Sequence, residues 1–189
     1  MNTPSSSLKN NFLISMPVHG ESKYQDSLIY ICHQGEYGSM GIVINQEYHM
    51  DLKTMLEHLK IDTNADILSQ PVYRGGDVQN DRGFILHPHN NTDKWLSSYQ
   101  LNDELSLTSS VDILEAMAIG QGPTSSHVAL GYIGWGPGEL ETELIDNLWL
   151  NCPANLDIIF NVAAADKMQA AASLIGVRLD SLTSHSGKA

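Results

Sequence analysis

The sequence predicts an α+β fold with a mixed or antiparallel sheet, and three observations support this prediction. The 189 residues are 42% hydrophobic, which is enough for the core of a single domain. The apolar runs are short, and glycine-rich connections separate them, as in hairpins. Strands and helices are interleaved without the regular alternation that a doubly wound parallel sheet requires.

The first third of the chain predicts three strands and a helix. "FLISMP" (12–17) is a strand that its proline ends, and "SLIYICH" (27–33) and "GIVINQ" (41–46) form a hairpin across "QGEYGSM". "DLKTMLEHLKI" (51–61) predicts a helix whose first amides Asp51 can cap. One face of this helix carries four apolar residues, namely Leu52, Met55, Leu56 and Leu59.

The rest of the chain predicts further strands and helices in turn. "YRGGDVQNDRGFILHP" (73–88) is typical of two strands around a glycine-rich loop, with "NDRG" as a turn. A helix begins at Ser109 or Ser110 with Val111, Leu114, Met117 and Ala118, and "HVALGYIGW" (127–135) is a central strand. The last segments are an acidic helix "GELETELIDN" (138–147), extended "LWLNCP" (148–153) and "LDIIF" (156–160), and a helix "AADKMQAAASLIG" (164–176) that Gly176 closes.

Both ends of the chain are polar and aperiodic. We expect one domain over residues 12–179, with flexible tails at 1–11 and 180–189. The sequence has no run of the roughly 20 apolar residues that a membrane span needs and no apolar segment of a signal peptide near its start. These features predict a cytoplasmic protein that does not associate with membranes.

The charge and the cysteines limit the classes of partner and compartment. Acidic residues outnumber basic ones 22 to 10, the net charge is −12, and the isoelectric point is about 4.8. Nucleic-acid binding depends on clusters of lysine and arginine, so the sequence argues against direct binding to DNA or RNA. Cys32 and Cys152 each lie in or beside an apolar run, which predicts buried, reduced thiols.

Three motifs that could carry chemistry are incomplete. The glycines of "GYIGWGPGELETEL" precede a helix, but glutamates replace the lysine and hydroxyl residue of a phosphate loop, so a strand-to-helix connection is favoured. "YGSMG" around Ser39 lacks the spacing of a nucleophile elbow. His87 and His89 lack further ligands nearby and are interpreted as exposed loop residues. We therefore predict no metal and no cofactor.

The candidate site lies in residues 74–87. Mutual pairing of Arg74, Asp77, Asp81 and Arg82 within a structural loop is the favoured interpretation. The alternative is a polar cleft formed by these four residues and His87, with Trp135 as a wall. There an arginine could hold a carboxylate or phosphate through two hydrogen bonds, and the histidine could transfer protons.

Several segments, in order, resemble the AlgH/YqgE family, also known as UPF0301 or DUF179. They are "FLISMP", "GSMGIVIN", "PVYRGGDVQNDRGFILHP", "HVALGYIGWGPGELETEL" and "NLWLNCP", within residues 12–179. The resemblance implies a branched, mixed but largely antiparallel sheet with a barrel-like part, surrounded by helices, in bacterial cytoplasmic and plant plastid proteins. It implies no catalytic residues, and the family's bacterial name derives from a regulatory role in alginate production.

Two functional hypotheses remain open after these observations. The first is a non-enzymatic regulatory or interaction protein that acts on transcription through a protein partner, because its net charge of −12 disfavours direct contact with DNA. The second is an enzyme or small-molecule binder that uses a polar cleft near residues 74–87.

Overall fold

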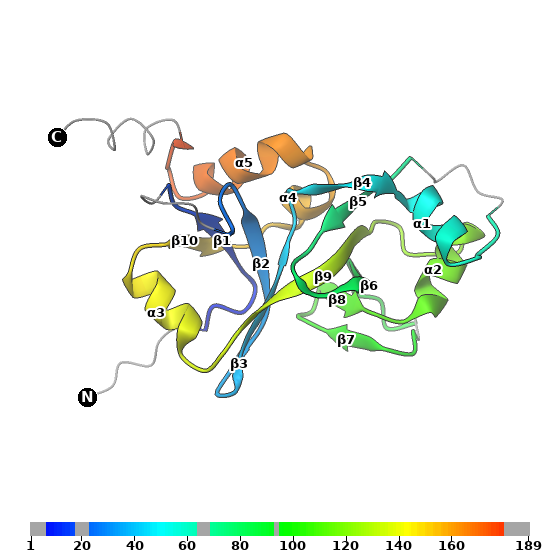
Figure 1. Ribbon diagram of the computed structural model, residues 1–189, viewed down its shortest axis with the longest axis horizontal. Helices are drawn as coiled ribbons and strands as arrows, with labels where there is room; N and C mark the ends of the chain where they lie inside the picture. Colours follow the sequence, from blue (N-terminus) through cyan, green and yellow to red (C-terminus); the bar gives the residue numbers. More distant parts are fainter. Residues whose placement is uncertain (1–6, 18–22, 64–68, 93–94, 180–189) are drawn as a thin grey trace.

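A computed structural model describes residues 7–17, 23–63, 69–92 and 95–179 and has an α+β fold (Figure 1). In these residues the strands are β1 (Asn11–Ser15), β2 (Leu28–Gly35), β3 (Gly38–Val43), β4 (Glu47–Asp51), β5 (Pro71–Arg74), β6 (Val78–Pro88), β7 (Ser98–Gln100), β8 (Leu105–Thr108), β9 (His127–Trp135) and β10 (Trp149–Pro153). The helices are α1 (Leu52–His58), α2 (Val111–Ala118), α3 (Glu139–Ile145), α4 (Leu156–Phe160) and α5 (Lys167–Ser173), and a short 3-10 helix, Ala164–Asp166, precedes α5.

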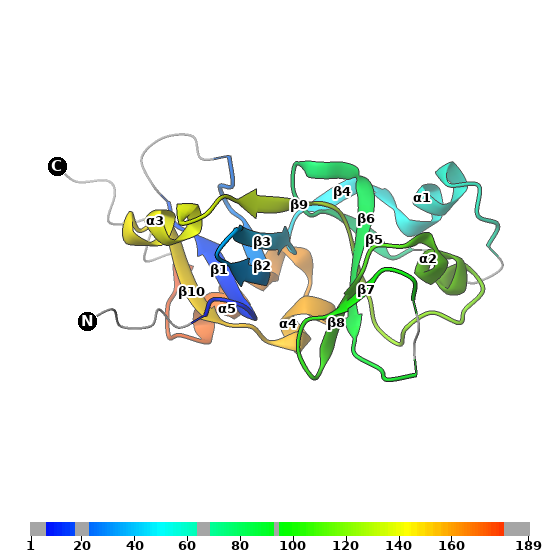
Figure 2. The same cartoon turned by 90° about the horizontal axis from the view of Figure 1, so that it is seen from below.

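The strands form one branched sheet, and β9 is its branch point. The main order is β10-β1-β2-β3-β9-β6-β8-β7, and β4 pairs with β5, which joins β9 from the side. Residues 133–135 of β9 pair with β3, whereas residues 128–130 pair in parallel with β5 and antiparallel with β6. The remaining strand pairs of the described residues are antiparallel, and the sheet curls into a half-barrel (Figure 2). The predicted fold class is therefore confirmed.

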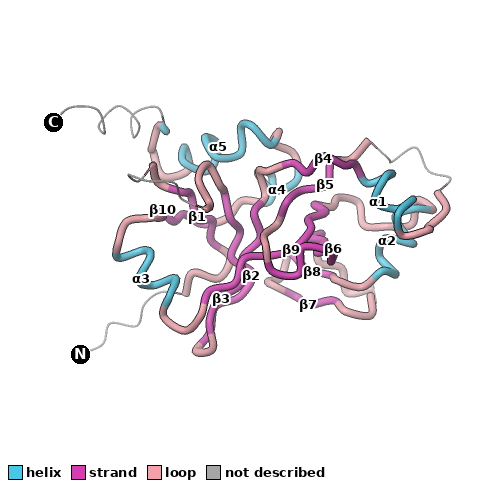
Figure 3. The backbone as a smooth tube through the Cα atoms, viewed as in Figure 1, coloured by secondary structure: helices cyan, strands magenta, loops and turns pink. Residues whose placement is uncertain are grey.

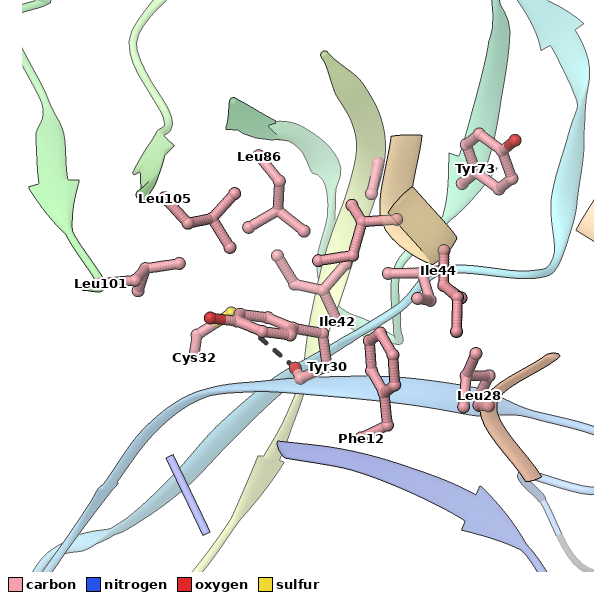
Figure 4. Packing of buried hydrophobic residues seen from close by; sticks show 14 of the residues in the cluster. Phe12, Leu28, Tyr30, Cys32, Ile42, Ile44, Tyr73, Leu86, Leu101 and Leu105 are labelled. Carbon is pink, nitrogen blue, oxygen red and sulfur yellow. Dashed lines mark hydrogen bonds between the residues drawn. The ribbon is translucent and has the colours of Figure 1, made fainter. Parts of the chain in front are cut away.

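The apolar runs of β1–β3 are continuous because both faces of this part of the sheet are buried. Alternate residues of β2, Leu28, Tyr30 and Cys32, lie in the main core, whereas Ile29 and Ile31 lie in a second core beneath α3. The main core also includes residues of β6, β8, α4 and α5, so it joins the two halves of the molecule. Figure 4 shows Phe12 and Tyr30 of one half facing Leu86 and Leu105 of the other.

Helices α1 and α2 cover the outer face of the other half, at the end of the molecule opposite α3 (Figures 1 and 3). Asp51 caps α1 as predicted, because its carboxylate accepts a hydrogen bond from the Thr54 amide at 2.8 Å. Leu52, Met55 and Leu56 are buried, but Leu59 is 45% exposed, because the helix ends before it. Val111 at the start of α2 is likewise exposed, so one apolar residue of each predicted helix lies at the surface.

Polar contacts explain two of the local predictions that were wrong. "LDIIF" forms helix α4, because the Asn155 side chain accepts hydrogen bonds from the amides of Asp157 and Ile158 and so begins a helix. His87 is buried in β6 and not exposed in a loop, because Thr108 on the neighbouring β8 hydrogen-bonds its Nε2 at 2.8 Å.

The folded unit includes residues that the sequence analysis assigned to the N-terminal tail. Leu8 is buried in the core beneath α3, and its amide donates a hydrogen bond to the Gln34 side chain at 2.6 Å. Residues 8–11 therefore belong to the folded unit and not to a tail. The other parts of the predicted tails, residues 1–6 and 180–189, lie outside the described residues.

The two cysteines are free and buried in the main core, as predicted. Burial raises the pKa of both thiols, because a charged thiolate loses its hydration in an apolar environment. We therefore expect native protein to react with a thiol reagent such as DTNB only as fast as it unfolds. Labelling should become rapid in denaturant, and rapid labelling of both thiols in native buffer would contradict this prediction.

Candidate functional site

The predicted site residues lie on and beside a large bulge in β6. Val78 pairs with Tyr132 of β9 and Gly83 pairs with Leu130, so residues 79–82 of β6 lie opposite Gly131 alone. Gln79 adopts a positive φ of 49° within this bulge. "NDRG" therefore lies inside a strand as a bulge, and the turn between β5 and β6 consists of residues 75–77. Bulges of this kind direct side chains away from the regular pleat.

Two glycines in this turn allow the chain to cross β9 in direct backbone contact. Gly75 donates its amide hydrogen to Leu130 and accepts one from Val43, both within 2.9 Å. A Cβ atom on Gly76 would lie 2.1 Å from the carbonyl carbon of Tyr132. We predicted that Gly75, Gly76 and Gly83 adopt backbone angles that other residues avoid, but their φ values are not positive. At Gly75 and Gly76 the requirement comes from the close approach of two backbones.

An open groove lies between the bulge and the two helices of this half. Its larger part, about 620 Å³, has an apolar floor of Met50, Met55 and Leu130, with Arg74 and Asp81 among the residues around it. A second part of about 380 Å³ shares Met55, Leu59 and Asp81 with the first and extends to α2. We call the whole depression the α1–α2 groove; its other lining residues are Tyr48, His58, Gly76, Gln79, Asn80, Arg82, Gly83, Ile85, Ser109, Ser110, Val111 and Leu114.

Arg74 and Asp81 are the predicted site residues that keep their charged groups available in this groove. Both side chains are exposed, and within the described residues neither forms a hydrogen bond or an ion pair. The mutual pairing that we expected among Arg74, Asp77, Asp81 and Arg82 does not occur in the described part of the chain. Two opposite charges therefore flank an apolar floor.

Arg82 and Asp77 are held by residues distant in sequence. The Arg82 guanidinium donates hydrogen bonds to the carbonyl and hydroxyl oxygens of Ser109, which link the bulge to the start of α2. Asp77 is not among the residues that line the groove, and it forms an ion pair with Lys23, which lowers the pKa of the Asp77 carboxyl. These two side chains thus stabilise the position of the bulge and the turn.

His87 and Trp135 lie outside the groove. His87 joins β6 to β8 in the main core, as described above. Trp135 is buried at the far end of β9, where its Nε1 donates a hydrogen bond to Glu143 of α3 at 2.8 Å. Trp149 donates to the same carboxylate oxygen at 2.7 Å. The structure therefore separates these two residues from Arg74 and Asp81, which line the groove.

Sequence reasoning missed the apolar residues of the groove. Tyr48 and Met50 belong to β4, a strand that the sequence analysis did not predict, and Leu59 was placed on the core face of α1. A signal existed for Leu59, because "EHLKI" is followed by polar residues and the helix could end there. Tyr48 and Met50 carry no local signal, because their exposure depends on how β4 pairs with β5.

The described residues contain no group of three or more His, Cys, Asp or Glu side chains that could hold a metal ion. In the same part of the chain no helix is long and apolar enough to cross a membrane. The groove residues offer two guanidinium groups, Arg74 and Arg82, one carboxylate, Asp81, and an apolar floor for binding.

Fold and groove together define an α+β protein whose branched sheet carries an open groove beside its bulge. A model of the AlgH-like family matches residues 12–180. A UPF0301 protein of Thioalkalivibrio sulfidiphilus is 46% identical over 187 residues, which cover 99% of this chain and 100% of the relative. A UPF0301 protein of Hahella chejuensis is 41% identical over 189 residues, with 100% of both chains covered. The chain therefore belongs to the AlgH-like family, as the sequence predicted.

Two solved structures support the fold assignment. The solution structure of the AlgH protein from Pseudomonas aeruginosa matches with a TM-score of 0.80 at 40% identity, over 100% of both chains. A crystal structure of a protein from Corynebacterium diphtheriae matches with a TM-score of 0.74 over 96% of this chain and 94% of that one. The second pair is 14% identical, so it shows the shared fold alone.

Proposed function

We propose that this protein is a non-enzymatic interaction protein of the cytoplasm that regulates transcription by binding a protein partner in the α1–α2 groove. The observation that carries the proposal is the chemistry of that groove. An apolar floor of Met50, Met55 and Leu130 lies next to Arg74 and Asp81, which have no partner within the described residues. Methionine, tyrosine and arginine are enriched at protein interfaces, and methionine adapts to partners of different shape.

The charges favour a protein as the partner. The net charge of −12 repels a polyanion, and the groove itself carries charges of both signs, namely Arg74, Arg82 and Asp81. A polypeptide segment that carries one acidic and one basic side chain would pair with both, and this pairing would fix its direction in the groove. The protein would regulate transcription through the partner that binds in the groove, and the level of regulation would depend on which partner occupies it.

The groove proposal predicts which surface position contacts the partner. A photo-crosslinking amino acid at Leu59, 45% exposed in the groove, should capture a partner in the cells of origin, and Arg74→Ala should reduce the captured amount by about tenfold. The matched control is the same amino acid at Ile145, which is 78% exposed on α3 at the opposite end. Capture of the same proteins from both positions, or retention of capture with Arg74→Ala, would reject the groove as the docking site.

A small-molecule site in the same groove is the second candidate, and two observations favour it. The volume of about 620 Å³ is typical of ligand sites, and Arg74 is available to hold a carboxylate or phosphate through two hydrogen bonds. Titration of isotope-labelled protein with an aromatic carboxylate distinguishes the two candidate functions, with the chemical shifts of the backbone amides as the readout of binding. Saturable shifts confined to the groove that Arg74→Lys weakens would favour this function, and an unchanged spectrum would exclude it for this ligand class.

A further inference from the structure

The margins of the branched sheet are formed by strands that have a neighbour on one side. Within the described residues, β7 pairs with β8 alone, β10 with β1 alone and β4 with β5 alone. The backbone N–H and C=O groups on the outer side of such a strand can pair with an added strand, so natural proteins protect their edges with charges, prolines or irregular pairing. Whether an edge can accept a further strand therefore depends on the residues along it.

The edges at β4 and β10 carry protection of this kind. β4 contains the charged residues Glu47 and Asp51, and its register against β5 is irregular between them. β10 ends at Pro153, which has no N–H group to donate. These features disfavour a further strand beside β4 or β10.

The edge at β7 lacks this protection. The strand contains neither a charged residue nor a proline, its three residues are exposed, and it pairs with β8 without a shift in register. Ser97 and Leu101, directly before and after β7, are hydrogen-bonded through their backbones to residues at either end of β8. Because the backbone groups of an antiparallel strand alternate in direction, the N–H and C=O groups of Ser98 and Gln100 point away from β8. Donors and acceptors therefore alternate along the outer edge of β7.

An exposed tyrosine extends the main core to this edge. Tyr99 lies opposite Leu107 of β8, so the two side chains lie on the same face of the sheet. Leu107 is 8% exposed and belongs to the main core, whereas Tyr99 is 53% exposed. Leu96, directly before β7, is 87% exposed. A strand beside β7 would cover part of the Tyr99 ring and would remove apolar surface from water.

The charges around β7 favour one chemistry and one direction for the added strand. An antiparallel strand would continue the pairing of β6, β8 and β7, and its N-terminal end would lie beside the turn that follows β7. Asp103 and Glu104 are exposed in that turn, so a basic residue at this end would pair with them. Lys9, whose ammonium lies 5.6 Å from the centroid of the Tyr99 ring, disfavours a second basic residue beside the middle of β7.

We propose that the outer edge of β7 binds an extended segment of a partner protein, which joins the sheet as an antiparallel strand with a basic residue at its N-terminal end. The backbone of the segment would form hydrogen bonds with Ser98 and Gln100, and an apolar side chain would cover Tyr99. These three residues are not among those that line the α1–α2 groove, so this site does not depend on the function proposed for the groove.

A short peptide tests the proposal by titration of isotope-labelled protein. It has arginine at its N-terminal end, followed by alternating valine and threonine, and both of its ends are blocked. At millimolar concentration it should shift the amide proton signals of Ser98 and Gln100 downfield and slow the hydrogen exchange of these amides. The same peptide with every backbone amide N-methylated should bind about tenfold more weakly, because it has no N–H groups to donate. Glutamate in place of arginine should weaken binding about threefold.

Matched variants assign the binding to the edge of β7. Gln100→Pro removes a donor from the outer edge without removing a hydrogen bond to β8, and it should weaken peptide binding about tenfold. Gln100→Thr keeps this donor, and Arg74→Ala changes the groove alone, so both should bind the peptide as wild type does. The N-methylated peptide is compared on wild-type protein, so that result does not depend on the folding of the proline variant.

Four results would overturn the proposal. The first is equally tight binding of the N-methylated peptide, and the second is a set of shifts along β4 or β10 in place of β7. The third is the absence of any shift at β7 with millimolar peptide. The fourth is a dimer that forms through β7 without peptide, since the edge would then bind a second copy of this chain.

Discussion

Replacement of Gly76 by valine should lower the free energy of unfolding by about 3 kcal/mol or more, as expected for a buried backbone clash. A Cβ atom at this position would lie 2.1 Å from both the carbonyl carbon and the carbonyl oxygen of Tyr132. Neither chain can retreat, because Gly75 is hydrogen-bonded to Leu130 on one side and to Val43 on the other. Urea unfolding followed by circular dichroism would measure the loss.

Two other glycines are controls for this substitution. Gly83→Ala should cost well under about 1 kcal/mol, because its nearest neighbour is the flexible end of Met55 at 3.2 Å. Gly120→Ala should cost about 1 kcal/mol, because Gly120 has a φ of 75° but open space around it. Arg74→Ala and Asp81→Ala should leave stability nearly unchanged, since both side chains are exposed. Equal losses for Gly76 and Gly83 variants would refute the backbone-crossing explanation.

The helices that sequence predicted correctly are those with local signals. Asp51 caps α1 and Leu52, Met55 and Leu56 follow at helical spacing, so neighbours in sequence determine the outcome. The prediction of an extended segment at "LDIIF" was wrong because the local sequence does not distinguish a strand from a helix there. A run of five mostly apolar residues has no period long enough to separate strand from helix, and the deciding signal was the single residue Asn155.

The architecture around the site depends on residues far apart in the chain. The bulge at residues 79–82 exists because β6 pairs with β9 on both sides of Gly131, and no local pattern encodes that register. Sequence reasoning named Arg74 and Asp81 as members of one cleft only as the alternative to mutual pairing, and both residues line the groove. It could not predict that Asp77 pairs with Lys23, 54 residues earlier, or that Arg82 bonds Ser109, 27 residues later.

Buried polar residues were the least predictable part of the sequence. His127 and Lys167 lie in apolar segments, and each was assigned to a strand or helix without a role of its own. Their burial follows from the packing of α4 and α5 on the sheet, which brings Lys167 next to Tyr73. The sequence shows that such a residue is polar, but the fold alone decides whether it is hydrated.

Lys167 should make the protein more stable as the pH rises from about 8 to 10.5. The side chain is 1% exposed, its ammonium donates a hydrogen bond to the Ile159 carbonyl at 2.7 Å, and it lies over the Tyr73 ring. Burial lowers its pKa from 10.5 to about 8, although Glu47 partly opposes this shift. The unfolded chain therefore holds this proton more tightly than the folded protein does.

The sign of the pH dependence follows from that difference in proton binding. Below about pH 8 both states are protonated and the folded state carries the full cost of the buried charge; above 10.5 neither is protonated and the cost has vanished. Between these limits the stability of wild type relative to Lys167→Met should rise by about 3 kcal/mol. The comparison of the two proteins removes the titration that they share and leaves the contribution of Lys167 together with its contact to Tyr73.

The measurement is urea unfolding of wild type and Lys167→Met at a series of pH values across this interval. Lys53→Met, which changes an exposed lysine on α1, is the matched control and should show no such rise relative to wild type. A difference between wild type and Lys167→Met that stays constant with pH would mean that Lys167 keeps its proton in the folded protein. In that case the ammonium would be as well solvated by the Ile159 carbonyl and the Tyr73 ring as by water, and the lowered pKa would be wrong.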